Sequence, residues 1–188
     1  MAPDTFTPVL TARLCLRPPR AEDAERIYRR YASDPEVLRY VSWPRHSSVA
    51  DTRQFLEYSL AEWRRWPVGP LLMEDRVGGE LVGSTGLEFE TSHRASTGYV
   101  IARDRWGKGY ASEALRAVVD LARQIRVDRL YALCHVAHDA SRRVLERVDF
   151  ELVAVLPRYC VFPNLGVVEP QDVCRYEARQ MAEGGLVS

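Results

Sequence analysis

The sequence STGYVIARDRWGKGYASEALRAVVDLA, residues 96–122, carries the most informative pattern of the chain. Residues 96–102 predict a strand, and apolar residues recur at helical spacing over 109–125. Between them lies the turn Trp106-Gly107-Lys108-Gly109-Tyr110-Ala111. Glycines there let the backbone approach a ligand closely, and the N–H groups and dipole of the following helix favour an anion such as phosphate. An ordinary strand-to-helix turn is the alternative interpretation.

The rest of the chain predicts further strands and helices in the order β-α-α-β-β-β-α-β-α-β-β. This order, without repeats or linkers, predicts one mixed-sheet α/β (α+β) domain over residues 1–188, with its core at about 11–178. The other predicted strands are 11–17, 71–75, 80–89, 129–136, 151–162 and 172–178, and the other predicted helices are 21–32, 49–65 and 138–148.

Several of these predictions are specific enough to be checked. Ser47 or Ser48 is expected to cap helix 49–65, and Asp139 is expected to cap the helix that starts near 138. The nearly continuous apolar run at 129–136 predicts a central strand that is covered on both faces. Pro157 is expected to break or bend the strand 151–162.

Composition limits the classes of protein that fit. The 188 residues carry 26 basic and 26 acidic side chains, so the strongly basic balance of a general nucleic-acid binder is absent. No stretch reaches the ~20 apolar residues of a membrane helix, and the N-terminus lacks the features of a signal peptide. These features predict a soluble cytoplasmic protein. The four cysteines form no CxxC pair, so no metal site is expected, and each sits in an apolar setting that predicts burial.

Two common phosphate-binding motifs do not fit the glycine turn. A P-loop needs Ser or Thr after its lysine, and here Lys108 is followed by Gly109. A dinucleotide fingerprint would place its third glycine at Ser112, and it needs an acid at the end of the next strand. Asp128 has about the right spacing but precedes that strand.

A third pattern does fit. The stretch 96–122 closely resembles the acyl-CoA-binding core of the GNAT superfamily of N-acetyltransferases, and it is most similar to the branch of Rim-type ribosomal-protein N-terminal acetyltransferases. TARLCLRPPRAEDAERIYRRYASDPEVLRYVSWP (11–44), HDASRRVLERVDFE (138–151) and DVCRYEA (172–178) resemble the other parts of that branch in the right order. The resemblance implies a GNAT-like fold with a mixed, mostly antiparallel central sheet flanked by helices.

The resemblance also implies how acetyl-CoA would bind. The family's turn, Gln/Arg-x-x-Gly-x-Gly/Ala, becomes Trp106-x-x-Gly109-x-Ala111, so only its first position departs. Backbone N–H groups would hold the pyrophosphate, and a backbone N–H near Val100 or Ile101 would face the thioester oxygen. The Lys108 side chain would either contact a phosphate or extend into solvent as a variable position of the motif. The residues that the resemblance assigns to the cofactor in this turn are Trp106, Gly107, Lys108, Gly109, Tyr110, Ala111 and Ser112.

The catalytic residues match the family less closely. Many members have a Tyr acid where this chain has Leu145, whereas the Rim-type branch has Asn-x-x-Ser, which here reads His138-x-x-Ser141. Ser141 would then supply a hydroxyl near the CoA sulfur, or it bonds locally to the backbone as a first-turn serine. His138 would contact the cofactor or cap its helix. Arg143, beside Arg142, would reach the phosphates or lie on a solvated face.

The general base is a further departure, because the branch often has Glu where this chain has Ser96. Glu88 is the preferred candidate and Glu90 the alternative, and either would act through a water. An acceptor amine of low pKa needs no base. Asp149 stands where the family has Gly, which puts the local turn in question.

The leading functional hypothesis is an acetyl-CoA-dependent N-acetyltransferase that acts on a protein N-terminus or a small-molecule amine. The alternative is a non-catalytic acyl-CoA-binding module of the same fold, suggested by the departures at Ser96, His138 and Asp149. A scaffold that has lost CoA binding is disfavoured by the intact glycine turn. The expected partners are acetyl-CoA and an amine, with no metal, nucleic acid or membrane, in a monomer or homodimer.

Overall fold

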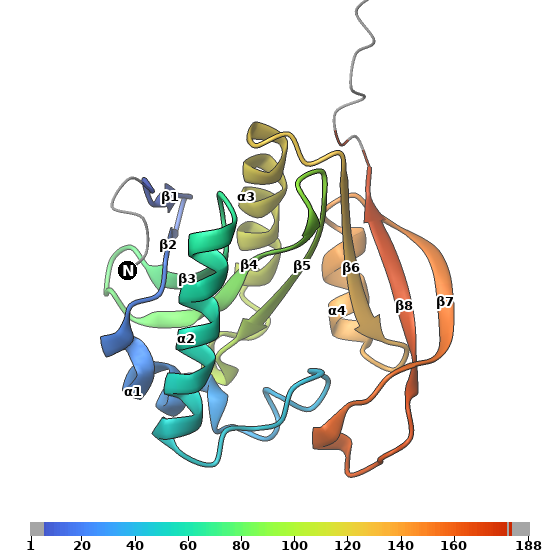
Figure 1. The fold of residues 1–188 in the computed structure, drawn as a ribbon, viewed down its shortest axis with the longest axis horizontal. Coiled ribbons are helices and arrows are strands. Elements are labelled where there is room, and N and C mark those ends of the chain that lie inside the picture. The colour runs from blue at the N-terminus through green and yellow to red at the C-terminus, as the bar shows by residue number, and fades with distance from the viewer. Residues whose placement is uncertain (1–5, 180, 182–188) are drawn as a thin grey trace, which may run out of the picture.

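An open sheet of eight strands runs through the molecule in the order β1-β2-β3-β4-β5-β6-β8-β7 (Figure 1). The computed structural model describes residues 6–179 and 181, and the two ends of the expected domain lie outside this range. Neighbouring strands pair antiparallel except β5 and β6, which are parallel. The strands are β1 Val9–Leu10, β2 Leu14–Arg17, β3 Pro70–Asp75, β4 Leu81–Thr91, β5 Arg94–Ile101, β6 Arg129–His135, β7 Phe150–Cys160 and β8 Gln171–Ala178.

Helices cover the sheet unequally (Figure 1). Helix α3 buries its apolar stripe against β2, β4 and β5, and α4 packs on β6 and β7. Helices α1 and α2 lie on the opposite face of the β2–β5 half. No helix covers that face of β6, β8 and β7 in the described part of the chain. The helices are α1 Ala24–Ile27, α2 Val49–Arg65, α3 Tyr110–Gln124 and α4 Asp139–Glu146.

The predicted order of elements is confirmed, with local differences in the first half. Only residues 14–17 of the expected strand 11–17 form a strand, β2, because a tight turn closed by a backbone hydrogen bond of 2.9 Å from Thr11 to Leu14 takes up its first residues. The short strand β1, which pairs with β2, precedes this turn and was not expected. The expected helix 21–32 is a chain of short 3-10, α and π segments rather than one regular helix. Ser48 caps α2 as expected, and Asp51 completes a capping box with it.

Two predictions in the second half are wrong. Strand β6 is central, between β5 and β8, but a helix covers only one of its faces, and on the other face Leu133 is 36% exposed between the buried Tyr131 and His135. Helix α4 begins at Asp139, so its N-cap residue is His138 and not Asp139. The side chain of His138 makes no capping hydrogen bond, which frees the imidazole for another role.

Two irregular positions have clear geometry. The pairing of β7 with β8 shifts between Leu156 and Cys160, so the expected bend at Pro157 is confirmed. Asp149 has a φ of +58°, in the left-handed region where glycine is usual, and Asp is among the residues that tolerate it best. The glycine-like turn before β7 therefore persists with Asp in place of Gly. No helix among residues 6–179 is long and apolar enough to cross a membrane.

Candidate active site

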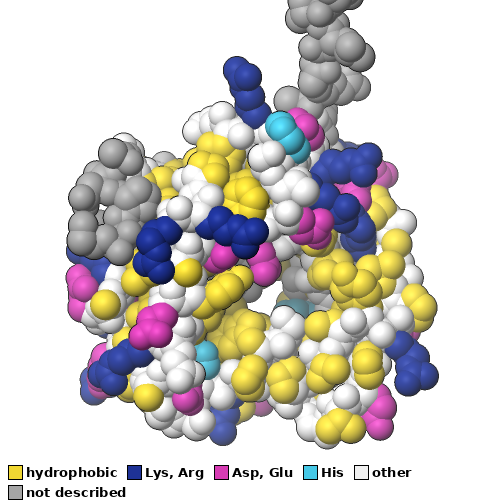
Figure 2. All heavy atoms as spheres, viewed as in Figure 1, with side chains coloured by type: hydrophobic (Ala, Val, Ile, Leu, Met, Phe, Trp, Pro, Cys, Tyr) yellow, Lys and Arg dark blue, Asp and Glu magenta, His cyan; other side chains and the backbone are white. Residues whose placement is uncertain are grey.

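Strands β5 and β6 diverge in the middle of the sheet. They pair at only three positions, the last of which joins Ser96 to Tyr131, whereas β5 continues to Ile101 and β6 to His135. The far part of β5 pairs with β4 on one side, so its other edge faces the opening between the strands. A Cβ atom added to Gly98 on this edge would meet no atom within 4 Å. The surface is hollowed in the same region, between α2 and β6 (Figure 2).

The glycine turn lies where β5 leads into α3. Gly107 and Gly109 have φ values of +71° and +80°, so both need the left-handed conformation that glycine adopts without strain. Within the described chain, the first backbone N–H of α3 that donates to a turn carbonyl is that of Glu113, to Gly109 O at 3.1 Å. The N–H groups from Gly107 to Ser112 therefore remain available to an anion at the positive end of the helix dipole.

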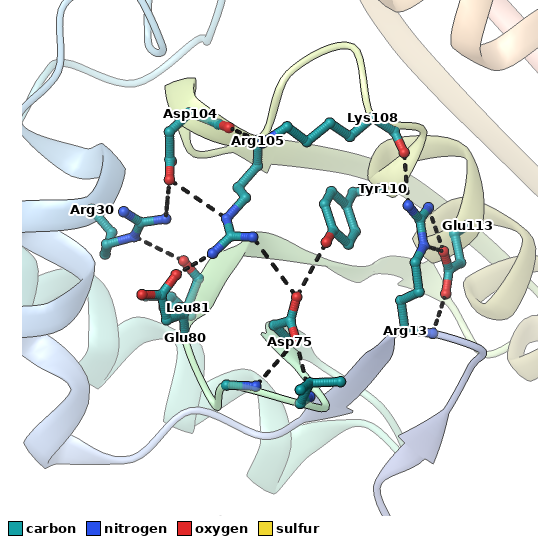
Figure 3. Close-up of polar contacts among 12 residues, drawn as sticks. Arg13, Arg30, Asp75, Glu80, Leu81, Asp104, Arg105, Lys108, Tyr110 and Glu113 are labelled. Carbon is teal, nitrogen blue, oxygen red and sulfur yellow. Dashed lines mark hydrogen bonds and ion pairs between the residues drawn. The ribbon is translucent and has the colours of Figure 1, made fainter.

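A clamp from the N-terminal hairpin fixes this turn (Figure 3). The Arg13 guanidinium donates to the Lys108 carbonyl at 2.9 Å and to the Glu113 carboxylate at 2.7 Å. The Thr11 hydroxyl donates to the same carboxylate at 2.6 Å. Although burial opposes it, hydrogen bonding by Thr11 and Arg13 lowers the pKa of Glu113, so the clamp stays ionised at neutral pH.

A second group of side chains supports the other side of the turn (Figure 3). Arg105 binds Glu80 and lies 3.8 Å from the Asp75 carboxylate, which also accepts a hydrogen bond of 3.1 Å from the Tyr110 hydroxyl. Backbone N–H groups of the β3–β4 turn hold the pKa of Asp75 below its usual range. Tyr110, predicted as a cofactor residue, is thus an anchor of the turn in this structure.

Two other predicted cofactor residues also bond within the turn. The Lys108 ammonium donates to the Asp104 carbonyl at 2.9 Å, so the only lysine of the chain folds back on its own loop. The Trp106 indole N–H donates to the Ile101 carbonyl at 2.8 Å, while nearly half of the side chain remains exposed. Arg30, in the π-helical segment Tyr28–Ala32 that follows α1, binds the Asp104 carboxylate at 3.0 Å. The side chains of the turn are thus engaged in contacts that fix its conformation, and its backbone N–H groups remain to bind an anion.

Ser141 faces the opening from the first turn of α4. Its hydroxyl lies 3.0 Å from the Tyr99 hydroxyl of β5, and Tyr99 also donates weakly to the Ser141 carbonyl at 3.4 Å. Burial raises the pKa of Tyr99 to about 12, so Tyr99 is protonated at neutral pH and can donate to Ser141. Cys134 lies behind them, 6% exposed, and burial raises the pKa of its thiol to about 12.

The four cysteines differ in burial. Cys134 and Cys174 are buried, as the sequence predicts, and they stand opposite each other on β6 and β8. The prediction is wrong for Cys15 and Cys160, which are half-buried. They lie on β2 and β7, near the two edges of the sheet. Among the described residues, no group of three or more His, Cys, Asp or Glu side chains is placed to hold a metal ion.

The imidazole of His138 lies on the α1–α2 side of the opening. It stacks on the Tyr40 ring, with centroids 4.7 Å apart and an angle of 26° between the rings. His135 also packs against Tyr40, at 5.0 Å, and its Nδ1 accepts the Ala137 N–H at 3.0 Å. Phe162, from the β7–β8 loop, closes the edge of this stack against His135.

The two acidic candidates for the base have different surroundings. Glu88 is exposed on β4 and accepts one long hydrogen bond, 3.4 Å, from the Tyr58 hydroxyl of α2. Glu90 binds Arg94 at 2.8 Å and accepts a short hydrogen bond from Tyr131. Glu90 is thus fully engaged, whereas Glu88 has a free oxygen that can reach a water.

The only asparagine of the chain joins the two halves of the molecule. The Asn164 amide N–H₂ donates to the carbonyls of Leu38 at 2.7 Å and Trp43 at 2.9 Å, and its oxygen accepts the Arg45 N–H at 2.8 Å. These bonds connect the β7–β8 loop to the α1–α2 loop, and Figure 1 shows the two loops approaching each other beyond the diverging strands. The α1–α2 loop carries Tyr40, so this clasp determines where that ring lies.

Comparison with known proteins identifies the family. A family model described as an acetyltransferase (GNAT) domain matches residues 13–151. This chain belongs to the GNAT family. The N-acetyltransferase YoaA of Bacillus subtilis (strain 168), itself uncharacterized, is 30% identical over 161 residues, which cover 81% of this chain and 88% of YoaA.

Solved structures show the same GNAT fold. A GNAT acetyltransferase from Bacillus anthracis has a TM-score of 0.78 at 22% identity, over 91% of this chain and 97% of its own. RimL, a ribosomal L7/L12 α-N-protein acetyltransferase solved in complex with coenzyme A, has a TM-score of 0.78 at 19% identity, over 90% of this chain and 95% of RimL. Membership of the family supports acetyl transfer as the general activity, and the expected GNAT-like fold is confirmed.

Within this GNAT fold, most of the predicted site residues lie around one opening. The glycine turn is at one end of the free edge of β5, and His138 and Ser141 face that edge from α4. Glu88 lies on the side of α2, and Arg143 is exposed on α4. Sequence reasoning missed two residues, namely Tyr99 and Asn164. Tyr99 looked like a strand residue, and no sequence pattern relates Asn164 to a loop more than a hundred residues earlier.

Proposed function

We propose that this chain transfers the acetyl group of acetyl-CoA to a primary amine, either a protein N-terminus or a small-molecule amine. The observation that carries the proposal is the free edge of β5, which runs from the unbonded N–H groups at Gly107–Ser112 to the Ser141 hydroxyl. The names of related proteins support it, because YoaA is called an N-acetyltransferase and RimL was solved with coenzyme A.

The opening suits the parts of acetyl-CoA. A pyrophosphate needs several aligned donors, and the start of α3 offers consecutive N–H groups held by the Arg13–Glu113 clamp. An extended pantetheine arm needs an unpaired strand edge, which β5 offers beyond Ser96. Open space at Gly98 leaves room for this arm. In the proposed arrangement, a backbone N–H near Val100 or Ile101 faces the thioester oxygen.

Acetyl transfer requires the amine to lose a proton and the thiolate to leave. A thiolate of pKa ~8.5 is a fair leaving group, so weak acid assistance is enough. Ser141 is proposed to donate its hydroxyl hydrogen toward the sulfur, while the Tyr99 hydroxyl stabilises the serine oxygen. Glu88 is the acidic candidate for the base and would act through a water.

The test is thiol release from acetyl-CoA in the presence of peptides with different N-termini and of small primary amines, with acetyl-CoA binding measured by calorimetry. An acetyltransferase binds acetyl-CoA and releases thiol in proportion to one class of acceptor. Tight binding without release for any acceptor would favour the acyl-CoA-binding module. Absence of binding would contradict both.

A further inference from the structure

The imidazole of His138 has an edge free for proton transfer. Its face stacks on Tyr40, which leaves both ring nitrogens at the rim of the stack. Within residues 6–179, no side chain or backbone group makes a hydrogen bond or ion pair with these nitrogens. The family resemblance places Asn here, and an amide cannot accept a proton near neutral pH. We propose that His138 is the general base that takes the proton from the acceptor amine, a role that rests on the proposed acetyl transfer.

The neighbouring histidine cannot serve as well. His135 is 8% exposed, and its Nδ1 accepts the Ala137 N–H at 3.0 Å. This bond requires an unprotonated Nδ1, so the neutral ring carries its hydrogen on Nε2 and has no free lone pair in its plane. His135 therefore holds the stack in place, whereas His138 keeps a lone pair for substrate.

The position of His138 relative to Ser141 fits the two proton transfers. His138 is the N-cap of α4 and Ser141 lies in its first turn, so both side chains leave the same end of the helix. Ser141 reaches toward Tyr99, whereas His138 reaches toward Tyr40 on the α1–α2 side. The attacking nitrogen and the leaving sulfur bond to the same carbon. The base that serves the nitrogen and the acid that serves the sulfur must therefore lie close together, each near its own atom.

His138 is neutral over the range where acetyl transfer is expected. Burial and the nearby His135 lower its pKa, and Asp139 opposes this shift. The other groups around the stack are Tyr40 and, against the ring of Tyr40, Arg39. Glu88, the acidic candidate, is exposed on β4 and would reach the amine only through a water, so it is the weaker candidate for the base.

The proposed step balances in protons and electrons. The acceptor ammonium gives one proton to solvent, and its lone pair then forms the C–N bond with the thioester carbon. The tetrahedral carbon carries an oxyanion, which collapses and expels the sulfur with the electron pair of the C–S bond. His138 takes the second proton from nitrogen and later releases it to solvent, while the thiolate gains the hydroxyl proton of Ser141 and Ser141 regains one from solvent. The products are the amide, the free thiol and one net proton released.

The test compares His138→Asn with the matched control His135→Asn, using an acceptor identified for the parent protein. His138→Asn introduces the residue that the family has here. General base catalysis is typically worth ~100- to 10,000-fold, so kcat/KM for the acceptor should fall at least ~100-fold in this variant, with acetyl-CoA affinity unchanged. His135→Asn should fall far less.

The pH profile separates a base from a merely structural residue. Because protonation disables the base, log kcat/KM of the parent should fall at acidic pH with a slope of about two, one proton on the amine and one on His138. The His138→Asn profile should keep a slope of about one, from the amine alone. His135→Asn should keep the steeper limb.

Each other outcome overturns the inference. An unchanged kcat/KM or a retained steeper limb in His138→Asn would assign the base elsewhere. An equal loss of acetyl-CoA affinity and turnover would place His138 on the cofactor. If His138→Asn failed to fold while His138→Gln folded normally and kept full activity, His138 would be structural. A parent protein that releases no thiol with any amine would instead contradict the proposed function.

Discussion

The hydroxyl groups of Tyr99 and Ser141 lie 3.0 Å apart and connect β5 to α4 across the opening between the diverging strands. Tyr99 is a buried phenol whose pKa is raised to about 12, so it keeps its hydrogen at neutral pH and can donate it to Ser141, in which case the Ser141 hydrogen is free to point elsewhere. This relationship aims a weak acid at the place where the thiolate would leave.

Removing the Ser141 hydroxyl should therefore affect the chemical step more than binding. In Ser141→Ala, kcat and kcat/KM should fall together by about 10- to 100-fold, at or below the low end of general-acid effects because a thiolate needs little help. Tyr99→Phe should show a smaller fall. Steady-state kinetics, calorimetry with acetyl-CoA and thermal melting measure the three quantities. A Ser141→Ala protein that melts and turns over like the parent would make the serine structural.

A bulky residue at Gly109 should weaken acetyl-CoA binding. The φ of +80° is unfavourable for Val, so Gly109→Val should distort the turn that presents the N–H groups. The added Cβ itself meets nothing closer than 3.6 Å, so backbone conformation and not crowding causes the effect. Affinity should fall at least ~10-fold, about 1.4 kcal/mol.

The matched control for this change is Gly78→Ala, in the β3–β4 turn, where the added Cβ meets only the Glu80 side chain at 3.9 Å. The control should bind acetyl-CoA like the parent in calorimetry. Equal affinity of Gly109→Val and the parent would show that the cofactor does not use this turn.

Breaking the Asn164 clasp should impair acceptor binding while leaving the cofactor site intact. In Asn164→Asp, the donors to Leu38 and Trp43 are lost and a carboxylate faces two carbonyls. We expect KM for the acceptor to rise several-fold, acetyl-CoA affinity to stay unchanged, and unfolding free energy to fall by about 1–3 kcal/mol.

A matched amide-to-acid change is Gln171→Glu, at the first residue of β8, where the side chain donates to the nearby Glu169 carbonyl and not to the α1–α2 loop. This control should leave acceptor KM unchanged. If both variants raised KM equally, charge near the opening and not the clasp would be the cause.

Cys134 should be inert toward thiol reagents in the folded protein. Burial holds its pKa at about 12, so almost no thiolate forms at neutral pH. Cys160 and Cys15 are more exposed and should be labelled first. Peptide mapping after brief labelling gives the order, and early modification of Cys134 would mean that the opening is wider in solution than in this structure. Cys134→Ala should reduce stability without changing turnover.

Sequence patterns correctly predicted those parts of the fold that depend on interactions between residues close in sequence. The stripe of α3, the cap at Ser48 and the bend at Pro157 each follow from residues that are close in sequence. The exposure of Leu133 on β6 was not predictable from sequence. Leu133 resembles a core residue, and it is exposed because no helix covers its face of the sheet in the described part of the chain.

The same distinction holds for the site. The glycine turn and Ser141 were found because a motif carries them. The partners that position them were not, because Arg13 meets Glu113 and Asn164 meets Trp43 only after distant segments fold together. Asp139 was mistaken for the cap of α4 because cap preferences favour Asp, whereas the chain places His138 there with its ring turned to Tyr40.

The most direct test of the account is to follow the acetyl group itself. The protein is incubated with acetyl-CoA that carries a deuterated acetyl group and with the acceptor that gives the fastest thiol release, and the acceptor is analysed by mass spectrometry. The account predicts a deuterated acetyl group on the amine nitrogen, formed in equal amount to the thiol released. Thiol release with unlabelled acceptor, or tight acetyl-CoA binding with neither product, would contradict it.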